Sequence, residues 1–395
     1  MTHHVIVVGG GAGGRCARAA LLAAGVADVV TLDRDIPAAR FDDDTDTWGL
    51  TTADGETLRA RVVIAAYRPV QVPWLPDIAG RDGFLGESFH AAQWPAGFDP
   101  TGKRVAIVGA DATAGHYLPE LTKAAAAVTV FAHPPRRVVD ELPLVATRVK
   151  RGLARRIRPA ATAEPRPALV RSAVSAVTAS GIQTADGVDR GVDAIVYATG
   201  FTVPDSAAQT TLLGAGGVTA ARLWADGTEP YFGVAVHGLP NYFFIDGPDV
   251  DAQSRYIAEC VGLLERGGST RIEVRRSSYQ VFNERAYLRP AQPHPVASAF
   301  DLTGGTGGDA TYAGAATLTI AGAEHPVRVR LAGRLDPIDG HYHWQGTVFG
   351  AAALSDTRTA TLTVGERSAA ARIVEQTPWG THTVAGVGAP PYAPR

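Results

Sequence analysis

Cysteine is almost absent from this chain of 395 residues, which contains only Cys16 and Cys260. The two lie far apart, each within an apolar, helix-like run, so reduced and buried thiols are expected instead of a disulfide framework. Apolar runs long enough to cross a membrane are also missing, and the N-terminus enters a predicted strand without a basic region or cleavage site. A cytoplasmic protein is the resulting expectation.

An excess of charge of one sign is equally lacking, because Lys and Arg total 37 against 39 acidic residues. Such a chain has no net field that would draw it to nucleic acid or to an anionic membrane, so neither is expected as a partner. Signatures of a nucleophile elbow or of a phosphate loop ending in Gly-Lys-Ser/Thr are missing as well. No metal is predicted, since His341 and His343 lack the further ligands that a zinc site requires. A small-molecule substrate is the expected partner, and the sequence does not indicate the oligomeric state.

The first 260 or so residues alternate β-branched apolar runs with Ala- and Leu-rich helical patterns. This alternation is typical of α/β folds, in which helices cover largely parallel sheets. Two segments, "HVIVVGGGAGGRCARAALLAAG" (residues 4–25) and "KRVAIVGADATAGHYLPELTKAA" (residues 103–125), each combine a strand, a turn of small residues and a helix. We therefore predict two Rossmann-like dinucleotide-binding units.

The composition changes towards the C-terminus. Residues 286–310 are rich in Pro and Gly and predict a linker, and the short alternating segments that follow predict a small all-β domain. The expected organisation is a first nucleotide-binding unit from residues 1–100 and 191–285, a second from 101–190, the linker, and the all-β domain 311–395.

The first loop carries Gly9, Gly11 and Gly14 in the spacing G-x-G-x-x-G after an apolar strand. In such a loop the first glycine allows a tight turn, the second lets the backbone approach a pyrophosphate, and the third lets the helix pack closely on the strand. Asp33 closes the next predicted strand, where a carboxylate can accept hydrogen bonds from a ribose. Together these features predict a dinucleotide site; glycines that merely make a tight turn are the alternative.

Three further segments complete a pattern. Residues 84–95 are "FLGESFHAAQWP", residues 197–201 are "YATGF" and residues 237–249 are "HGLPNYFFIDGPD". With the two glycine loops, these segments resemble the flavin-containing monooxygenases over roughly residues 5–265, and residues 84–95 match in form the fingerprint of the Baeyer–Villiger branch. The C-terminal region, with "LDPIDGHYHWQG" at 335–346, resembles a small domain of unknown function that follows short monooxygenase-like chains in actinobacteria.

The resemblance implies an FAD-type first unit, an NAD(P)-type second unit and an NAD(P)H-linked monooxygenase. Such an enzyme oxidises a small organic molecule through a C4a-peroxide or hydroperoxide of the flavin. His90 is the implied catalytic residue, lying between the units and coupling NADPH binding to their motion. The residues that the resemblance assigns to FAD or its surroundings are Gly9, Gly11, Gly14, Asp33, Thr199, Gly200 and Gly247. Those assigned to NADPH or NADH are Gly109 and Ala114. Arg136 and Arg137 are candidates to replace the family arginine that reads the 2′-phosphate, and a solvated basic turn is the alternative for them.

Four features depart from the family pattern. Asp111 stands where the NADPH pyrophosphate comes closest, and a like-charge pair at about 4 Å costs roughly 4 kcal/mol at an effective dielectric near 20. Only about a dozen residues follow Asp33 where the family usually carries several dozen. His133 and Gln183 occupy positions where the family usually has arginines. A second hypothesis therefore stays open, namely a degenerate monooxygenase-fold protein with weakened or lost cofactor binding and a binding, scaffold or non-redox role.

Overall fold

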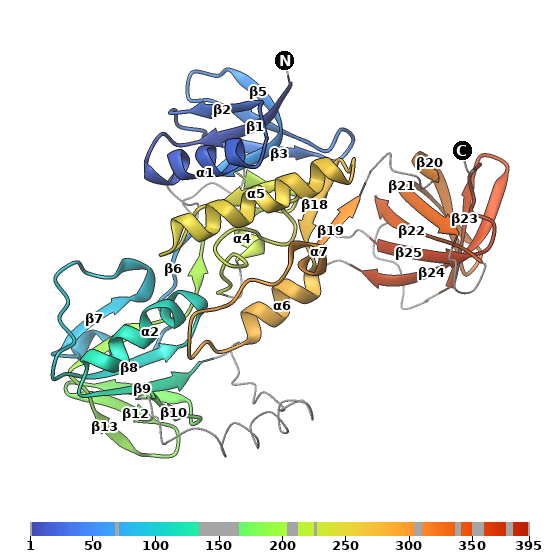
Figure 1. The fold of residues 1–395 in the computed structure, drawn as a ribbon. Coiled ribbons are helices and arrows are strands. Elements are labelled where there is room, and N and C mark those ends of the chain that lie inside the picture. The colour runs from blue at the N-terminus through green and yellow to red at the C-terminus, as the bar shows by residue number, and fades with distance from the viewer. Residues whose placement is uncertain are drawn as a thin grey trace, which may run out of the picture.

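The structure is a computed structural model in which three parts are visible, two α/β units on separate sheets and a β-barrel at the C-terminal end (Figure 1). The predicted α/β architecture with a small all-β domain after it is thereby confirmed. Within the residues described, no helix is long and apolar enough to cross a membrane. The structure describes residues 2–67, 71–133, 166–203, 212–224, 227–303, 310–335, 341–349, 359–376 and 382–393. Arg136 and Arg137, which the sequence suggests as candidates for the second dinucleotide site, lie outside these ranges.

The first sheet has the strand order β16-β3-β4-β5-β1-β2, with β17 paired to β5. β1 is parallel to β2 and to β5, whereas β3 and β4 form an antiparallel hairpin beside β5. The first glycine loop therefore leaves the carboxyl end of a parallel strand and enters helix α1 (Ala12–Ala23). The strands are β1 (Thr2–Val8), β2 (Val29–Leu32), β3 (Ala38–Asp42), β4 (Thr47–Thr51), β5 (Thr57–Ala65), β16 (Leu212–Leu213) and β17 (Tyr242–Phe244).

Side chains of β1 alternate between two hydrophobic cores. Val5 and Val7 enter one core, and Ile6 and Val8 enter the other. All four are at most 1% exposed. Because the strand is packed on both faces, the end of β1 and the loop that follows it are held firmly in place.

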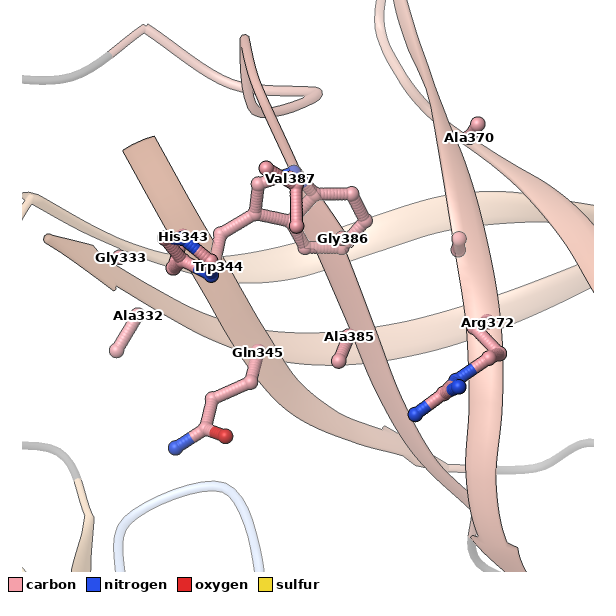
Figure 2. Close-up of a pocket in the computed structure, with 11 residues that line it drawn as sticks. Ala332, Gly333, His343, Trp344, Gln345, Ala370, Arg372, Ala385, Gly386 and Val387 are labelled. Atoms are coloured by element: carbon pink, nitrogen blue, oxygen red, sulfur yellow. The ribbon is translucent and has the colours of Figure 1, made fainter. Parts of the chain in front are cut away.

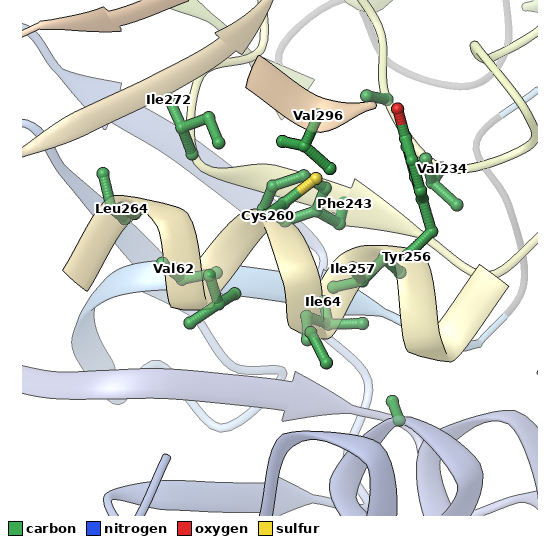
Figure 3. Packing of buried hydrophobic residues seen from close by; sticks show 14 of the residues in the cluster. Val62, Ile64, Val234, Phe243, Tyr256, Ile257, Cys260, Leu264, Ile272 and Val296 are labelled. Atoms are coloured by element: carbon green, nitrogen blue, oxygen red, sulfur yellow. The ribbon is translucent and has the colours of Figure 1, made fainter. Parts of the chain in front are cut away.

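Helix α5 (Val250–Arg266) covers the first of these cores (Figure 3). Its buried face includes Cys260 and lies over Val62 and Ile64 of β5. Both cysteines are free, and the predicted buried thiol is confirmed for Cys260, whereas Cys16 on α1 is half-buried.

The second sheet is parallel throughout, in the order β10-β9-β8-β14-β7. The second glycine loop joins β8 to helix α2 (Ala112–Ala124). β7 and β14 pair in this sheet although the predicted boundaries at residues 100 and 190 assign them to the first unit. The strands are β7 (Glu87–His90), β8 (Arg104–Gly109), β9 (Ala127–Ala132), β10 (Ala168–Val170) and β14 (Ala194–Tyr197).

Residues 286–303 are packed, in contrast to the predicted linker. Val296 and Phe300 are each 1% exposed, and β19 pairs with β18. Composition misses this packing because isolated apolar residues among prolines show no periodicity. The remaining elements of the two units are β6 (Val72–Pro73), β11 (Val174–Thr178), β12 (Gly181–Thr184), β13 (Asp189–Gly191), β15 (Phe201–Thr202), β18 (Arg271–Val274), β19 (Phe300–Thr303), α4 (Ala220–Leu223), α6 (Arg276–Glu284), α7 (Val296–Ala299), and the 3-10 turns η1 (Arg81–Gly83), η2 (Ala91–Gln93) and η3 (Ala215–Gly217).

The C-terminal strands close into a barrel in the order β20-β21-β22-β25-β24-β23. Alternate residues face inwards, and Leu318, Trp344 and Val348 form part of its core. The expected all-β domain is thus a barrel without free sheet edges. Its strands are β20 (Ala310–Ile320), β21 (Ala323–Leu335), β22 (Tyr342–Phe349), β23 (Thr359–Val364), β24 (Arg367–Gln376) and β25 (His382–Val387).

Candidate functional site

Of the three glycines in the first loop, Gly11 has room for a side chain, whereas Gly9 and Gly14 have none. Gly9 has a φ of +111°, and a Cβ there would lie 2.5 Å from the carbonyl oxygen of Ala66. A Cβ on Gly14 would collide with the carbonyl of Gly9, so these two glycines are required by close packing. A Cβ on Gly11 would meet no atom within 4 Å. The backbone in front of α1 is therefore accessible to a ligand.

Charged side chains flank this loop without blocking it. Asp33 follows β2 directly, and its Oδ1 accepts a hydrogen bond from the Gly10 N–H at 3.0 Å. Arg15 donates from Nη1 to the Gly10 carbonyl at 2.9 Å. Gly11 is the N-cap of α1, which has no side-chain cap among the described residues and no acidic residue in its first turn. This helix end, with its unsatisfied N–H groups and positive dipole, can hold an anion.

The second loop is capped from within. Asp111, the N-cap of α2, is fully buried. Its Oδ1 accepts a hydrogen bond from the Ala114 N–H at 2.8 Å, and its Oδ2 accepts one from the Gly200 N–H at 3.2 Å. Gly109, whose φ is +117°, allows the same tight turn as in the first loop. The carboxylate thus lies where the sequence pattern predicts a pyrophosphate.

A second carboxylate reaches the same helix end from a distant part of the chain. Glu229 is 4% exposed, and its Oε1 accepts a hydrogen bond from the Ala112 N–H at 2.8 Å. Sequence reasoning does not find this residue because its partner is 117 residues away and no motif surrounds it. Two N–H groups of the first turn of α2 are therefore bound to carboxylates of the chain itself.

Residues 84–95 act as a packing element beside α2. Trp94 stacks on Tyr117 of α2, with ring centroids 4.5 Å apart, and Phe89 meets Trp94 edge-on at 5.2 Å. Gly86 has no room for a Cβ because the Asp193 carbonyl lies against it. Aromatic stacking and close backbone approach are sufficient to explain these positions.

His90, at the end of β7, is 1% exposed. Its Nδ1 accepts a hydrogen bond from the Ala92 N–H at 3.1 Å, and its ring lies 5.7 Å from that of Phe201. Burial lowers the pKa of His90, although the nearby Asp111 carboxylate and the Gly200 backbone favour the charged imidazole. The histidine lies behind the second loop and does not line the cavity described below.

Thr199 and Gly200 adjoin the second loop. Thr199 is 4% exposed and donates from Oγ1 to the Trp74 carbonyl at 2.5 Å, and Gly200 donates its N–H to Asp111. Gly200 has a φ of +81° and lies against the carbonyl of Gly227. The segment "YATGF" therefore links the second loop to its neighbours.

A cavity of about 300 Å³ lies between the first turns of α2 and α5 and residues 290–293. Gly247 lines it together with Ala112, Thr113 and Glu229 at the end of α2, and no residue of the first glycine loop is among its lining residues. Burial raises the pKa of Asp246, whose Oδ2 accepts a hydrogen bond from Gln71 Nε2 at 2.6 Å. The polar and aromatic residues that line the cavity are Thr113, His116, Phe201, Glu229, Phe232, Asp246, Asp249, Gln253, Tyr256 and Gln292.

The barrel carries a wider, open concavity of about 850 Å³ (Figure 2). Ala332, Gln345, Ala385 and Arg372 lie in one register row across four strands, and their small or long polar side chains form its floor. Figure 2 shows Gln345 and Arg372 pointing away from the buried Trp344. None of its lining residues belongs to either glycine loop.

The short interval after Asp33 forms the β3–β4 hairpin. The turn of this hairpin meets the barrel through two ion pairs, Asp44 with Arg328 and Asp46 with Arg330. The interval that is shortened relative to the resembled family therefore serves as a contact for the C-terminal domain.

The two loops differ in whether they fit a dinucleotide. The first provides an uncapped helix end, open space at Gly11 and a carboxylate after β2, and these residues fit the pyrophosphate and ribose of FAD. The second provides a capped helix end in which Asp111 and Glu229 already accept the N–H groups, and these residues do not fit a pyrophosphate. The sequence motifs identify the residues of the first site except Arg15. Arg15 could have been found from its position in the first turn of the helix that follows the glycine loop.

Comparison with known proteins gives a match to one family model and matches to several relatives. Residues 309–393 match the family described as Domain of unknown function (DUF4873). The uncharacterized protein Rv0943c of Mycobacterium tuberculosis is 59% identical over 310 residues, which cover 77% of this chain and 89% of that protein. A Baeyer-Villiger monooxygenase of Streptomyces coelicolor is 27% identical over 339 residues, covering 65% of each chain.

Among solved structures, oxidized steroid monooxygenase bound to NADP aligns with a TM-score of 0.37 and 16% identity, covering 77% of this chain and 100% of that chain. Homologues of 24–27% identity are Baeyer-Villiger monooxygenases and a phenazine N-monooxygenase, which confirms the resemblance that the sequence motifs carry. This chain spans slightly less than two thirds of the length of the Streptomyces enzyme.

Proposed function

The chain belongs to the family of the uncharacterized mycobacterial protein Rv0943c, and from its flavin monooxygenase homologues and its open first loop we propose that it is an FAD-binding oxidoreductase. Its substrate is a small organic molecule bound in the cavity between the first turns of α2 and α5. Both strand-turn-helix units are of the Rossmann type in this proposal, and the first carries the FAD. The observation that carries it is the uncapped N-terminus of α1, with open space at Gly11.

Each group of the first loop has a distinct task in this proposal. Backbone N–H groups at Gly11 and in the first turn of α1 bind the pyrophosphate, and Arg15 adds a positive charge beside it. Asp33 accepts hydrogen bonds from the adenosine ribose. Bound FAD would supply two-electron oxidation and reaction with dioxygen. In the cavity between the first turns of α2 and α5, Asp246 is the group suited to hold a proton, because burial raises its pKa.

His90 has a positioning role in this proposal. Its imidazole is buried next to Asp111 and Gly200 and is absent from the cavity lining, so it supports the second loop and touches no substrate. The spacing of residues 84–95 is then explained by the packing of β7 on α2 and does not require a reaction at His90.

A second candidate function is a binding or scaffold protein without redox activity. Two observations favour it, the carboxylates that fill the end of α2 and the short hairpin that replaces a longer segment after Asp33. It differs from the first candidate in requiring no flavin.

The visible absorption spectrum of the purified chain, followed by titration with FAD, separates the two candidates. We expect a yellow protein, or a colourless one that FAD stabilises in a thermal shift assay with one site per chain. Because the first loop recognises pyrophosphate and ribose, ADP should compete with FAD whereas riboflavin should not. A colourless protein that FAD does not stabilise would remove the oxidoreductase and leave the scaffold.

A further inference from the structure

The end of α2 is the site that the family pattern assigns to a nicotinamide dinucleotide, and here it is filled by the chain. We infer that the second glycine loop is closed to NADPH and NADH, because Asp111 and Glu229 take the place of the pyrophosphate. This inference does not depend on FAD binding at the first loop. It limits the chain to the first loop as its dinucleotide site and assigns a structural role to the second.

The two loops provide an internal comparison. Gly11 and Asp111 are both N-cap residues, with φ of −67° in each and ψ of −169° and 173°. The two N-cap residues therefore share one backbone conformation and differ in their side chains, whereas the preceding residues differ in backbone, because Ala110 has a φ of +86° and Gly10 has no positive φ. At Gly11 the space in front of the helix is open, whereas at Asp111 the carboxylate bonds the Ala114 and Gly200 N–H groups.

Glu229 is fixed in its place by a second polar residue. The Glu229 N–H donates to Asn283 Oδ1 at 2.8 Å, and Asn283 Nδ2 donates to the Glu229 carbonyl at 3.1 Å. Asn283 is 4% exposed. α6 thus fixes the backbone of Glu229, and a rotation of its side chain would leave the Ala112 N–H without this acceptor.

The chain after α6 covers the same helix end. The Tyr287 N–H donates to the Ala110 carbonyl at 2.8 Å. A Cβ on Gly115 would lie 2.8 Å from Tyr287 Cβ and 2.9 Å from the Arg289 carbonyl oxygen, so the backbone of this segment lies directly against α2. This segment therefore packs on one side of α2, whereas Ala112, Thr113 and Glu229 line the cavity, so the two carboxylates are the groups that a dinucleotide would have to displace.

Electrostatics oppose such a displacement. Each carboxylate within about 4 Å of a phosphate weakens binding by about a thousandfold at an effective dielectric near 20. Asp111 is 0% exposed and Glu229 is 4% exposed, so solvent screens neither of them well. If FAD is bound at the first loop, the electrons that reduce it come from a donor that does not occupy the second.

Calorimetric titration of the full chain with NADPH and with NADH tests the inference, with FAD present at saturation if the protein binds it. We expect no saturable binding up to about 1 mM of either nucleotide. Any weak binding through the adenosine half at the first loop should disappear in Gly11→Asp. Saturable micromolar binding that persists in Gly11→Asp would overturn the inference.

The structural role of the second loop has its own readout. Without any nucleotide, Asp111→Gly should lower Tm by a few degrees, mainly because the buried Gly200 N–H loses its acceptor and to a smaller extent because α2 loses its side-chain cap. Asp111→Asn is the matched control; it keeps the shape and one acceptor and should lose less. An unchanged Tm in Asp111→Gly would contradict the role, and if that variant does not fold, the titration of the unmodified chain decides. Absence of FAD from the protein affects neither measurement.

Discussion

Arg330 of the barrel and Asp46 of the first α/β unit form an ion pair that is largely shielded from water, with side chains 20% and 4% exposed. Asp46 also accepts a hydrogen bond from Thr270 Oγ1 at 2.7 Å, so both oxygens of its carboxylate are used. The pair connects residues 284 positions apart and joins the hairpin turn after β3 to strand β21. The C-terminal domain is therefore attached to the unit that carries the candidate FAD loop.

Loss of this pair should weaken the whole molecule. Arg330→Met would remove this charged partner and leave the buried Asp46 carboxylate with the Thr270 hydroxyl and the neighbouring Arg271, so a loss of about 1.5–3 kcal/mol is expected. Arg328→Met is the control, because the Arg328 pair with Asp44 is exposed and contributes less than about 1 kcal/mol. Scanning calorimetry of both variants measures the difference, and equal transitions would show that the buried pair does not hold the barrel.

A single carboxylate should convert the first loop into a copy of the second. Gly11→Asp has room for its side chain and a φ of −67°, so the variant should fold with a Tm close to that of the parent. FAD affinity should fall by about a thousandfold because the new charge faces the pyrophosphate. Gly97→Asp, placed in equally open space elsewhere, is the matched control. Unchanged FAD binding in Gly11→Asp would place the nucleotide somewhere else.

The first loop could be predicted from sequence because its parts are local. Gly9, Gly11 and Gly14 belong to one strand-turn-helix segment, and Asp33 ends the neighbouring strand. Their periodicity and spacing define their positions before any tertiary contact is known. Which cofactor the loop holds is not encoded in that spacing and stays a proposal.

The closure of the second loop could not be predicted completely. Asp111 is visible in the sequence as a departure from the glycine pattern, and its capping of the Ala114 N–H is local, but its contact with the Gly200 N–H depends on the meeting of two strand ends. Glu229 and Asn283 carry no sequence signal, since their contacts span 117 and 54 residues. Long-range polar contacts of this kind follow from tertiary packing, which periodicity does not report.

His90 should matter for stability and not for FAD affinity. His90→Ala removes a buried ring that packs on Phe201 and accepts the Ala92 N–H, so a loss of about 1–3 kcal/mol is expected. Flavin affinity should change by less than about a factor of two or three, since the cavity lining is unaffected. We expect the reverse for His116→Ala, namely little change in stability and a lower FAD affinity, because His116 is half-exposed and lines the cavity. Denaturation curves and FAD titrations of both variants check this, and lost affinity with unchanged stability in His90→Ala would restore a catalytic role.

The stability of the barrel should fall in acid through His382. This side chain is 1% exposed, and burial lowers its pKa, so the folded barrel binds a proton less readily than the unfolded chain does. Stability is therefore complete above the unfolded-state pKa of about 6.5 and is lost as the pH falls below it, by at most about 1.4 kcal/mol per pH unit. His382→Leu should remove this share of the pH dependence, and His325→Leu, on a half-exposed histidine of the same barrel, is the matched control variant. His90 and His133 shift in the same direction and leave a residual slope in both variants. Thermal unfolding between pH 5 and pH 8 measures the slopes, and identical slopes for His382→Leu and the parent would show that the buried imidazole is protonated without cost.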